Sequence, residues 1–166
     1  MSVARDLKLA RLAKKHGAKS ALRTLWECRR NDIPFSWGLA MIEQESEWRN
    51  IFGGDHGPTP GNHAIPPYYH HEVTNERVRA LLNSGMANGV GYTQLTSPSY
   101  VREAMAKRGG AASTKNQIIV GMKVLRQKTG GDMSHAWRYN GDPSYQNDIQ
   151  PKAEAWHRRF KAAGLT

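Results

Sequence analysis

The feature that most constrains the fold is a succession of segments whose apolar residues recur at helical spacing, each bounded by glycine, proline or a capping residue. The 166 residues contain no internal repeat and no linker-like stretch. These patterns predict a single all-α, mainly helical domain over residues 1–166. The expected helices are 3–15, 21–30, 37–48, 75–85, 97–110, 113–131, a short one within 132–142, and 144–163.

Two segments do not follow the helical pattern. Residues 51–74 are rich in Gly, Pro and His, which predicts a long irregular loop inserted into the domain. A loop of this length within a compact domain is commonly functional. Residues 86–96, "MANGVGYTQLT", alternate around Gly89 and Gly91 and predict a tight turn or a small β-hairpin.

The chain begins with a basic amphipathic helix within residues 1–18. Ser20 and Ser36 are expected to cap the second and third helices. The lone cysteine, Cys28, excludes an internal disulfide, and we expect it to be a small buried hydrophobe. In the first two helices the expected inward-facing residues are Val3, Leu7, Ala10, Leu12, Leu22, Leu25 and Trp26.

The charge balance restricts the partners. Lys and Arg number 24 against 14 acids, a formal net charge of +10 that favours an acidic partner. Nucleic acid, an anionic membrane surface and an anionic cell wall all fit. No apolar run of signal-peptide length follows the cationic start, and no stretch approaches the roughly 20 apolar residues of a membrane span. We therefore expect no integral membrane segment, and delivery to any external target by something other than a signal of its own.

Glu43, Glu45 and Glu47 occur within five residues of one expected helix. Because successive helical residues advance by about 100°, Glu45 is expected in an apolar arc, with Glu43 and Glu47 on the opposite side. An apolar surrounding favours the protonated carboxyl group, which can then donate a proton to a leaving group. An ordinary buried salt bridge explains the pattern equally well. The residues expected to border the arc are Trp37, Met41, Ile42 and Trp48.

Three short segments resemble one enzyme family. "AMIEQESEW", residues 40–48, resembles the Glu-Ser segment of the lytic transglycosylase catalytic domain and of goose-type lysozyme. "GVGYTQLT", residues 89–96, is similar to the family's Gly-x-x-Gln segment, and "AWRYNGDPSY", residues 136–145, to its Tyr-Asn segment. The segments occur in the family's order, and the likeness spans about residues 20 to 160. It implies a lysozyme-like fold with one catalytic glutamate, Glu45.

The resemblance also implies which residues bind substrate. Ser46 lies beside the glutamate, where it would hydrogen-bond backbone or substrate, and Gln94 would hold the backbone or a sugar amide. Tyr92 stands where the family usually has an apolar residue, so its ring either stacks on a sugar or packs in the core. Tyr139 is implied as a cleft residue, with Asn140 as its structural partner.

The implied reaction is cleavage of the β-1,4 bond between N-acetylmuramic acid and N-acetylglucosamine in bacterial peptidoglycan, without a cofactor. Glu45 protonates the glycosidic oxygen and then acts as a base, while the sugar's 6-hydroxyl closes a 1,6-anhydro ring. Hydrolysing glycosidases use two carboxylates, so a single candidate favours this transglycosylase chemistry. The 49 positions between Glu45 and Gln94 exceed the usual family spacing, however. The inserted loop carries Asp55, which would activate water in an alternative hydrolytic muramidase.

The sequence gives weaker support to two other kinds of site, a metal site and a nucleic-acid-binding surface. The 51–74 loop holds four histidines with Asp55 and Glu72, but their spacing matches no compact metal motif, so we expect no metal. The basic stretches 11–19 and 157–163 fit phosphates, but no nucleic-acid motif accompanies them, so we expect no nucleic acid partner. A non-catalytic basic module that binds glycan or nucleic acid is the alternative of another class. The loop histidines are His56, His63, His70 and His71.

The small basic domain without a signal suggests a biological setting. We expect a monomeric phage lysin that acts on the bacterial cell wall. It would be either an endolysin held in the host cytoplasm before its release or a virion-associated enzyme.

Overall fold

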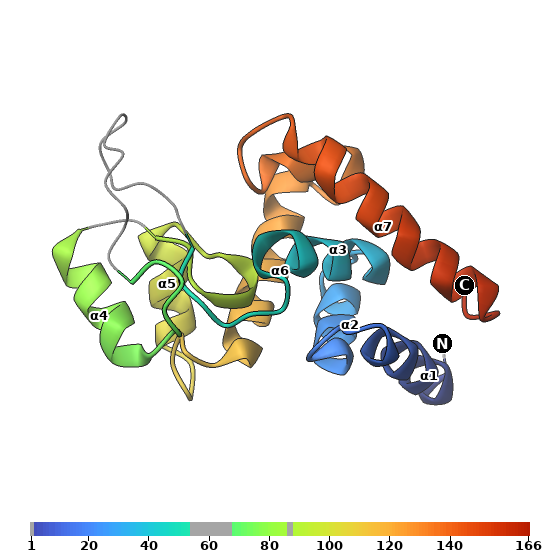
Figure 1. The fold of residues 1–166 in the computed structure, drawn as a ribbon, viewed down its shortest axis with the longest axis horizontal. Helices are drawn as coiled ribbons and strands as arrows, with labels where there is room; N and C mark the ends of the chain where they lie inside the picture. Colours follow the sequence, from blue (N-terminus) through green and yellow to red (C-terminus); the bar gives the residue numbers. More distant parts are fainter. Residues whose placement is uncertain (1, 54–67, 86–87) are drawn as a thin grey trace. The chain divides into compact units, whose positions relative to one another are not determined.

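Local signals in the sequence set the ends of the first two helices. The computed structural model describes residues 2–53, 68–85 and 88–166. Helix α1 (Val3–Lys15) begins after Ser2, whose hydroxyl accepts a hydrogen bond from the backbone N–H of Ala4 at 3.2 Å. Helix α2 is Ala21–Arg30. Both helices have the predicted bounds, and they lie side by side (Figure 1).

Helices are the main secondary structure of the rest of the described chain, as the apolar spacing predicts. The described residues contain isolated β-bridges but no β-strand, so the predicted all-α single domain is confirmed. One bridge, between Val90 and Leu95, encloses a short 3₁₀ helix, so the predicted tight turn is present in place of a hairpin. The other elements are α3 (Phe35–Ser46), α4 (Asn75–Ser84), η1 (Gly91–Thr93), α5 (Pro98–Met105), α6 (Thr114–Thr129), η2 (Met133–Arg138) and α7 (Tyr145–Ala162).

The packing divides the domain into two compact units. The first comprises Met1–Gln44 and Met122–Thr166, and the second comprises Glu45–Gly121. The boundaries fall inside α3 and α6, so each of these helices contributes residues to both units.

The core of the first unit is built around α3. Gly38 lies so close to α2 that a Cβ atom there would overlap the Sγ atom of Cys28. Cys28 is fully buried and its Sγ lies 3.6 Å from Sδ of Met122, which confirms its expected role as a small core residue. At the end of this core, the indole N–H of Trp156 donates a hydrogen bond to Oε2 of Glu43 at 2.7 Å.

Some expected faces and caps are wrong. The buried face of α1 includes Asp6, which pairs with Arg29, and this pairing leaves Val3 75% and Leu7 38% exposed. Trp26 is 50% exposed, with the Arg23 guanidinium lying 5.5 Å from its ring centroid. The side chain of Ser20 makes no capping hydrogen bond, and Ser36 lies inside α3, which begins one residue earlier.

The second unit brings the described ends of the 51–74 loop to the turn around η1. The Phe52 N–H donates to the His71 carbonyl at 2.9 Å, and the His70 N–H donates to the Phe52 carbonyl at 3.0 Å. On the other side, the Gly91 N–H donates to the Ile51 carbonyl at 3.0 Å. Backbone hydrogen bonds therefore hold three segments distant in sequence against one another in this unit.

Candidate functional site

The three glutamates near the end of α3 have different surroundings. Glu43 is half-buried and accepts the hydrogen bond from Trp156. Glu47 is exposed beyond the helix and forms an ion pair with Arg49 at 3.2 Å. Glu45, in the last turn, is half-buried and lines a hollow. Glu45 is therefore the glutamate of the three that is found here beside a space able to hold a ligand.

The helical arc predicted around Glu45 is wrong in two respects. Helix α3 ends at Ser46, and Glu47 and Trp48 adopt left-handed backbone angles, with φ of 49° and 63°. Trp48 therefore does not continue the arc. In addition, the four residues 39–42 are all fully buried. This part of α3 is therefore buried on every side, whereas the prediction assumed one apolar side and one solvated side.

The hollow beside Glu45 has a volume of about 230 Å³ and is formed entirely by the second unit. We call it the Glu45 hollow. It is smaller than the roughly 300 to 1,000 Å³ of a pocket for a drug-sized molecule, so it would hold one part of a longer ligand. Its lining includes Glu45, Ser46 and Gln94, which the sequence predicts as site residues, together with Arg49, Tyr69 and His70.

Ser46 joins the end of α3 to the turn around η1. Its side chain is buried, and its hydroxyl donates a hydrogen bond to the Tyr92 carbonyl at 2.9 Å. The Tyr92 ring is 6% exposed and packs edge-on against Trp48, with the ring centroids 6.4 Å apart. Of the two alternatives for Tyr92, these contacts match packing, and stacking on a sugar stays a prediction.

Gln94 holds backbone groups around the hollow, which is one of the two roles expected for it. Its Nε2 donates hydrogen bonds to the carbonyl oxygens of Gly91, at 2.7 Å, and Ile51, at 3.1 Å. The residue itself adopts a left-handed conformation with φ of 44°. Gly53 leaves room for this side chain, because a Cβ atom there would overlap Oε1 of Gln94.

Sequence analysis did not identify Gln117, whose side-chain amide holds the turn around η1 through hydrogen bonds. This side chain is fully buried in α6. Its Oε1 accepts a hydrogen bond from the Tyr92 N–H at 2.9 Å, and its Nε2 donates to Asn50 Oδ1 at 2.7 Å and to the Ala111 carbonyl at 2.8 Å. Gly91 lies against it with φ of 70°, and a Cβ atom there would overlap the amide. The sequence did offer one indication of this role, because Gln117 is a polar residue near the start of the most apolar helical segment.

Three further residues of the hollow were missed as site residues. Arg49 is exposed, and its Nε donates to the Ser46 carbonyl at 3.3 Å. Tyr69 is 42% exposed and its ring lies 3.9 Å from the His70 ring, centroid to centroid. The hollow thus combines a carboxylate, a guanidinium and an exposed aromatic pair, groups that suit a polar ligand with sugar-like faces.

The remaining predicted site residues belong to the first unit or lie outside the described residues. Tyr139 and Asn140 belong to the first unit. Tyr139 is buried and its carbonyl accepts a hydrogen bond from Lys128 Nζ at 2.8 Å, whereas Asn140 is exposed. Asp55, the second carboxylate of the hydrolytic alternative, lies outside the described residues, as do His56 and His63.

Two features of other protein classes are not found in the described residues. No group of three or more His, Cys, Asp or Glu side chains could hold a metal ion there. None of the helices that the structure describes is both long enough and apolar enough to cross a bilayer.

Comparison with protein families, with curated proteins and with solved structures found no significant match for the chain.

Proposed function

We propose that this protein cleaves the β-1,4 bond between N-acetylmuramic acid and N-acetylglucosamine in bacterial peptidoglycan, on a lysozyme-like fold. The observation that carries the proposal is that Glu45 and Gln94, which lie 49 positions apart in two of the resembling segments, line the same hollow. Ser46, the partner of Glu45 in its segment, lines that hollow too. The tertiary contacts of the second unit thus bring residues of two resembling segments to one hollow, and this supports the proposal.

The proposed reaction uses Glu45 twice. Its carboxyl group gives its proton to the glycosidic oxygen, and the bond from that oxygen to C1 of N-acetylmuramic acid breaks with both electrons leaving on the oxygen. The resulting carboxylate then takes the proton of the 6-hydroxyl of the same sugar. That oxygen attacks C1, which closes a 1,6-anhydro ring and returns Glu45 to its protonated form.

The other groups of the hollow would bind the glycan. Tyr69, with its exposed ring beside His70, offers a face for a sugar ring. The Arg49 guanidinium offers donors to an acceptor oxygen of the glycan or its attached peptide. Gln94 keeps its amide on two backbone carbonyls, so we assign it to shaping the hollow and not to direct chemistry.

The test is the substitution Glu45→Gln, assayed by the release of soluble fragments from purified peptidoglycan. We expect at least about a 100-fold loss of rate, because a positioned acid contributes roughly that much or more. Glu43→Gln is the matched control, since it makes the same change two positions earlier on the same helix and should keep activity. Undiminished cleavage by the Glu45 variant refutes the assignment.

Mass spectrometry of the products separates the two mechanisms. Fragments lighter by one water than the hydrolysis products indicate the transglycosylase reaction. Hydrated fragments indicate the alternative muramidase, and Asp55→Asn then tests whether that carboxylate activates the water. A wild-type protein that sediments with peptidoglycan but releases nothing would instead be a non-catalytic binding module.

The proposed setting is that of a monomeric phage lysin. Such an enzyme would reach the cell wall either from the host cytoplasm through a membrane lesion or as part of the virion. The basic charge suits a wall that carries anionic polymers.

A further inference from the structure

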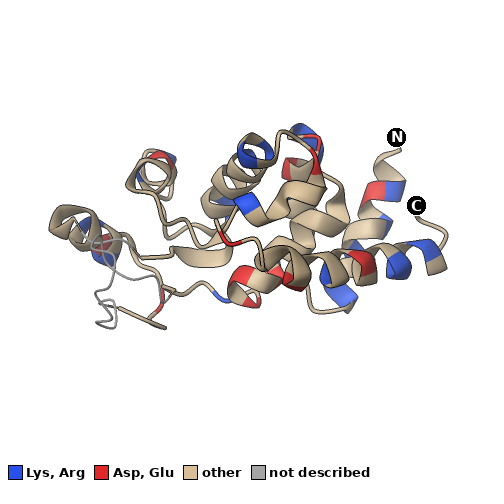
Figure 2. Ribbon diagram, turned by 90° about the horizontal axis from the view of Figure 1, so that it is seen from above, with Lys and Arg blue, Asp and Glu red and all other residues tan. Residues whose placement is uncertain are grey.

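The N-terminal pair of helices carries most of the net positive charge of the protein, +7 of the formal +10. Residues 1–30 include nine of the 24 Lys and Arg residues but only two of the 14 acids, Asp6 and Glu27. Both acids are buried and form ion pairs, Asp6 with Arg29 and Glu27 with Arg23 at 3.2 Å. The outward charge of this pair is therefore almost wholly positive. Basic residues of α1, near the N-terminus, are marked in blue in Figure 2.

The same helices expose large apolar side chains among these cations. Val3, Leu7 and Trp26 account for three of the four exposed large hydrophobic side chains that the described residues contain. Val3 is 75% exposed, Trp26 is 50% exposed and Leu7 is 38% exposed. Val3 precedes Leu7 by one helical turn on α1, and Trp26 follows Leu22 by one turn on α2. Exposed hydrophobic residues that share a face in this way, in contrast to ones scattered singly, indicate an interaction surface.

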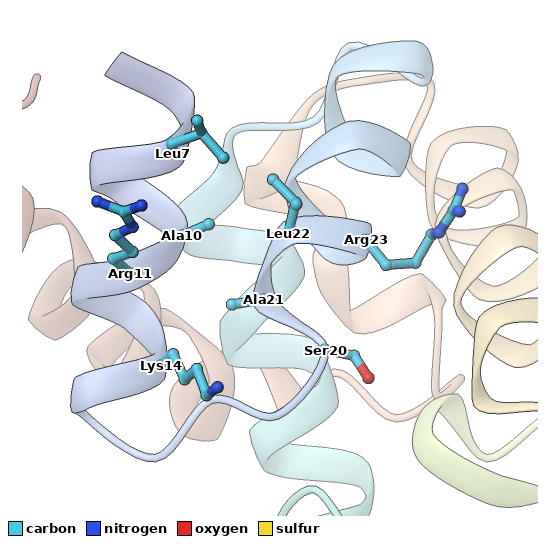
Figure 3. A pocket seen from close by; sticks show the side chains of 8 residues that line it. All are labelled: Leu7, Ala10, Arg11, Lys14, Ser20, Ala21, Leu22 and Arg23. Atoms are coloured by element: carbon cyan, nitrogen blue, oxygen red, sulfur yellow. The ribbon is translucent and has the colours of Figure 1, made fainter. Parts of the chain in front are cut away.

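A hollow of about 360 Å³ lies between the two helices. Figure 3 shows Leu7 of α1 and Leu22 of α2 pointing toward each other, with the small side chains of Ala10 and Ala21 between the helices. The cationic side chains in its lining include Arg11 and Lys14, both exposed. An apolar floor with a positively charged rim fits a ligand that is apolar at one end and anionic at the other.

We propose that this α1–α2 surface, made by Val3, Leu7, Arg11, Lys14, Leu22 and Trp26, binds the face of an anionic phospholipid bilayer. The cations would contact the lipid phosphates, the Leu7 and Trp26 side chains would enter the boundary between headgroups and acyl chains, and the hollow would take part of one acyl chain.

Charge complementarity alone would suit a phosphate polymer or a nucleic acid equally well. Such ligands offer no apolar phase, however, so they give no reason for the exposed Leu7 and Trp26 side chains to lie among the cations. A bilayer interface accommodates both kinds of side chain at once. The α1–α2 surface shares no residue with the Glu45 hollow, so this inference does not depend on the proposed reaction.

The first experiment is co-sedimentation with phosphatidylcholine vesicles that either contain or lack phosphatidylglycerol. We expect binding only where the anionic lipid is present. The double variant Arg11→Gln/Lys14→Gln should bind about 30-fold more weakly, because each cation near an anionic surface contributes about fivefold. The matched control Arg102→Gln/Lys115→Gln removes the same charges from exposed positions on α5 and α6 and should change binding by less than about threefold.

The second experiment separates a bilayer from an anionic polymer. The variant Leu7→Gln/Trp26→Gln keeps every charge and should bind the anionic vesicles at least about 10-fold more weakly. Circular dichroism verifies that each variant remains folded. Unchanged vesicle binding by this variant overturns the proposal. So does binding to a short DNA duplex or to polyphosphate as tight as that to the vesicles, because the surface would then recognise anions in general. Glu45→Gln should bind vesicles like the wild type, so the two proposals fail separately.

Discussion

The Ser46 hydroxyl donates a hydrogen bond to the Tyr92 carbonyl at 2.9 Å, although 46 positions separate the two residues in the chain. This contact fixes the last turn of α3, which carries Glu45, against the turn that carries Gln94. Two backbone hydrogen bonds join the start of the loop to the same turn: the Gly91 N–H donates to the Ile51 carbonyl, and the Gly53 N–H donates to the Gly89 carbonyl. The position of Glu45 relative to Gln94 therefore depends on a small set of buried polar contacts, and each of them can be tested.

Removing the Ser46 hydroxyl should affect both stability and activity. We expect Ser46→Ala to lower the free energy of unfolding by about 1 to 2 kcal/mol, because a buried hydrogen bond is lost. The rate of peptidoglycan cleavage should fall as well, since Glu45 is the preceding residue. Urea denaturation and the fragment-release assay measure the two effects. Ser99→Ala, at an exposed site, should change stability by less than about 0.5 kcal/mol. Equal effects of the two variants would contradict the role of Ser46.

The buried amide of Gln117 should be needed for the turn and not merely for helix α6. Gln117→Leu removes one acceptor and two donor contacts, so we expect a loss of about 2 to 4 kcal/mol in the free energy of unfolding. Gln127→Leu makes the same change at an exposed position of the same helix and serves as the control. Thermal or urea unfolding measures both. A Gln117 variant as stable as the control would show that the amide network contributes nothing.

The close approach of Gly53 to Gln94 predicts coupling between these two positions. Gly53→Ala should displace the Gln94 amide from its two carbonyl partners and reduce the rate of cleavage. In a Gln94→Ala background the added methyl group no longer meets an amide. The two substitutions should therefore be non-additive, with the double variant no less active than Gln94→Ala alone. A double-mutant cycle on the cleavage rate measures this, and strictly additive losses would refute the coupling.

The thiol of Cys28 should be unreactive in the folded protein. Burial, together with the nearby Glu27 carboxylate, raises the pKa of this thiol far above its ordinary value of 9.0, so the folded protein keeps the thiol proton. Iodoacetamide at pH 8 should therefore label Cys28 only after urea is added, as read by mass spectrometry. Rapid labelling of the native protein would contradict this expectation.

The raised pKa of the Cys28 thiol also predicts how the free energy of unfolding changes with pH. The unfolded chain loses the thiol proton above about pH 9.0, while the folded protein retains it, so unfolding becomes more favourable as the pH rises further. This contribution is fully present below pH 9.0 and should be missing from the pH dependence of a Cys28→Ala variant. Urea denaturation of both proteins between pH 8 and pH 10 provides the comparison.

The helices were largely predictable because their signals are local. Apolar spacing, Gly17 after α1 and the turn residues after Arg30 predicted the observed bounds of α1 and α2. The segment "NERVRALLNSG" predicted α4 to within one residue of its end. The end of α3 was not predictable in this way. Glu47 and Trp48 take left-handed backbone angles that nothing in their own side chains favours, and the helix therefore stops at Ser46. Where the chain leaves the helix, the Trp48 ring packs against the Tyr92 ring, which is a contact with a distant part of the sequence.

The faces of the first two helices were misassigned for an electrostatic reason. Helical spacing treats Asp6 as a solvated residue, but its pairing with Arg29 turns the carboxylate inward and leaves Leu7 outside. Trp26 is likewise exposed and in contact with the Arg23 guanidinium, although helical spacing predicted an inward position. The partner of Asp6 lies in another helix, whereas the partner of Trp26 lies three positions away on the same helix, and the apolar spacing of one segment indicates neither pairing.

The sequence by itself determined the all-α composition, most helix positions, the turn around Gly91 and the close spacing of three glutamates near the end of α3. The tertiary structure alone decided that Glu43 binds Trp156, that Glu47 faces solvent beside Arg49, and that Glu45 shares a hollow with Gln94. The physical reason is the range of the interactions involved. Helix formation depends on residues three or four positions apart, whereas each glutamate owes its surroundings to the path that the chain takes around it.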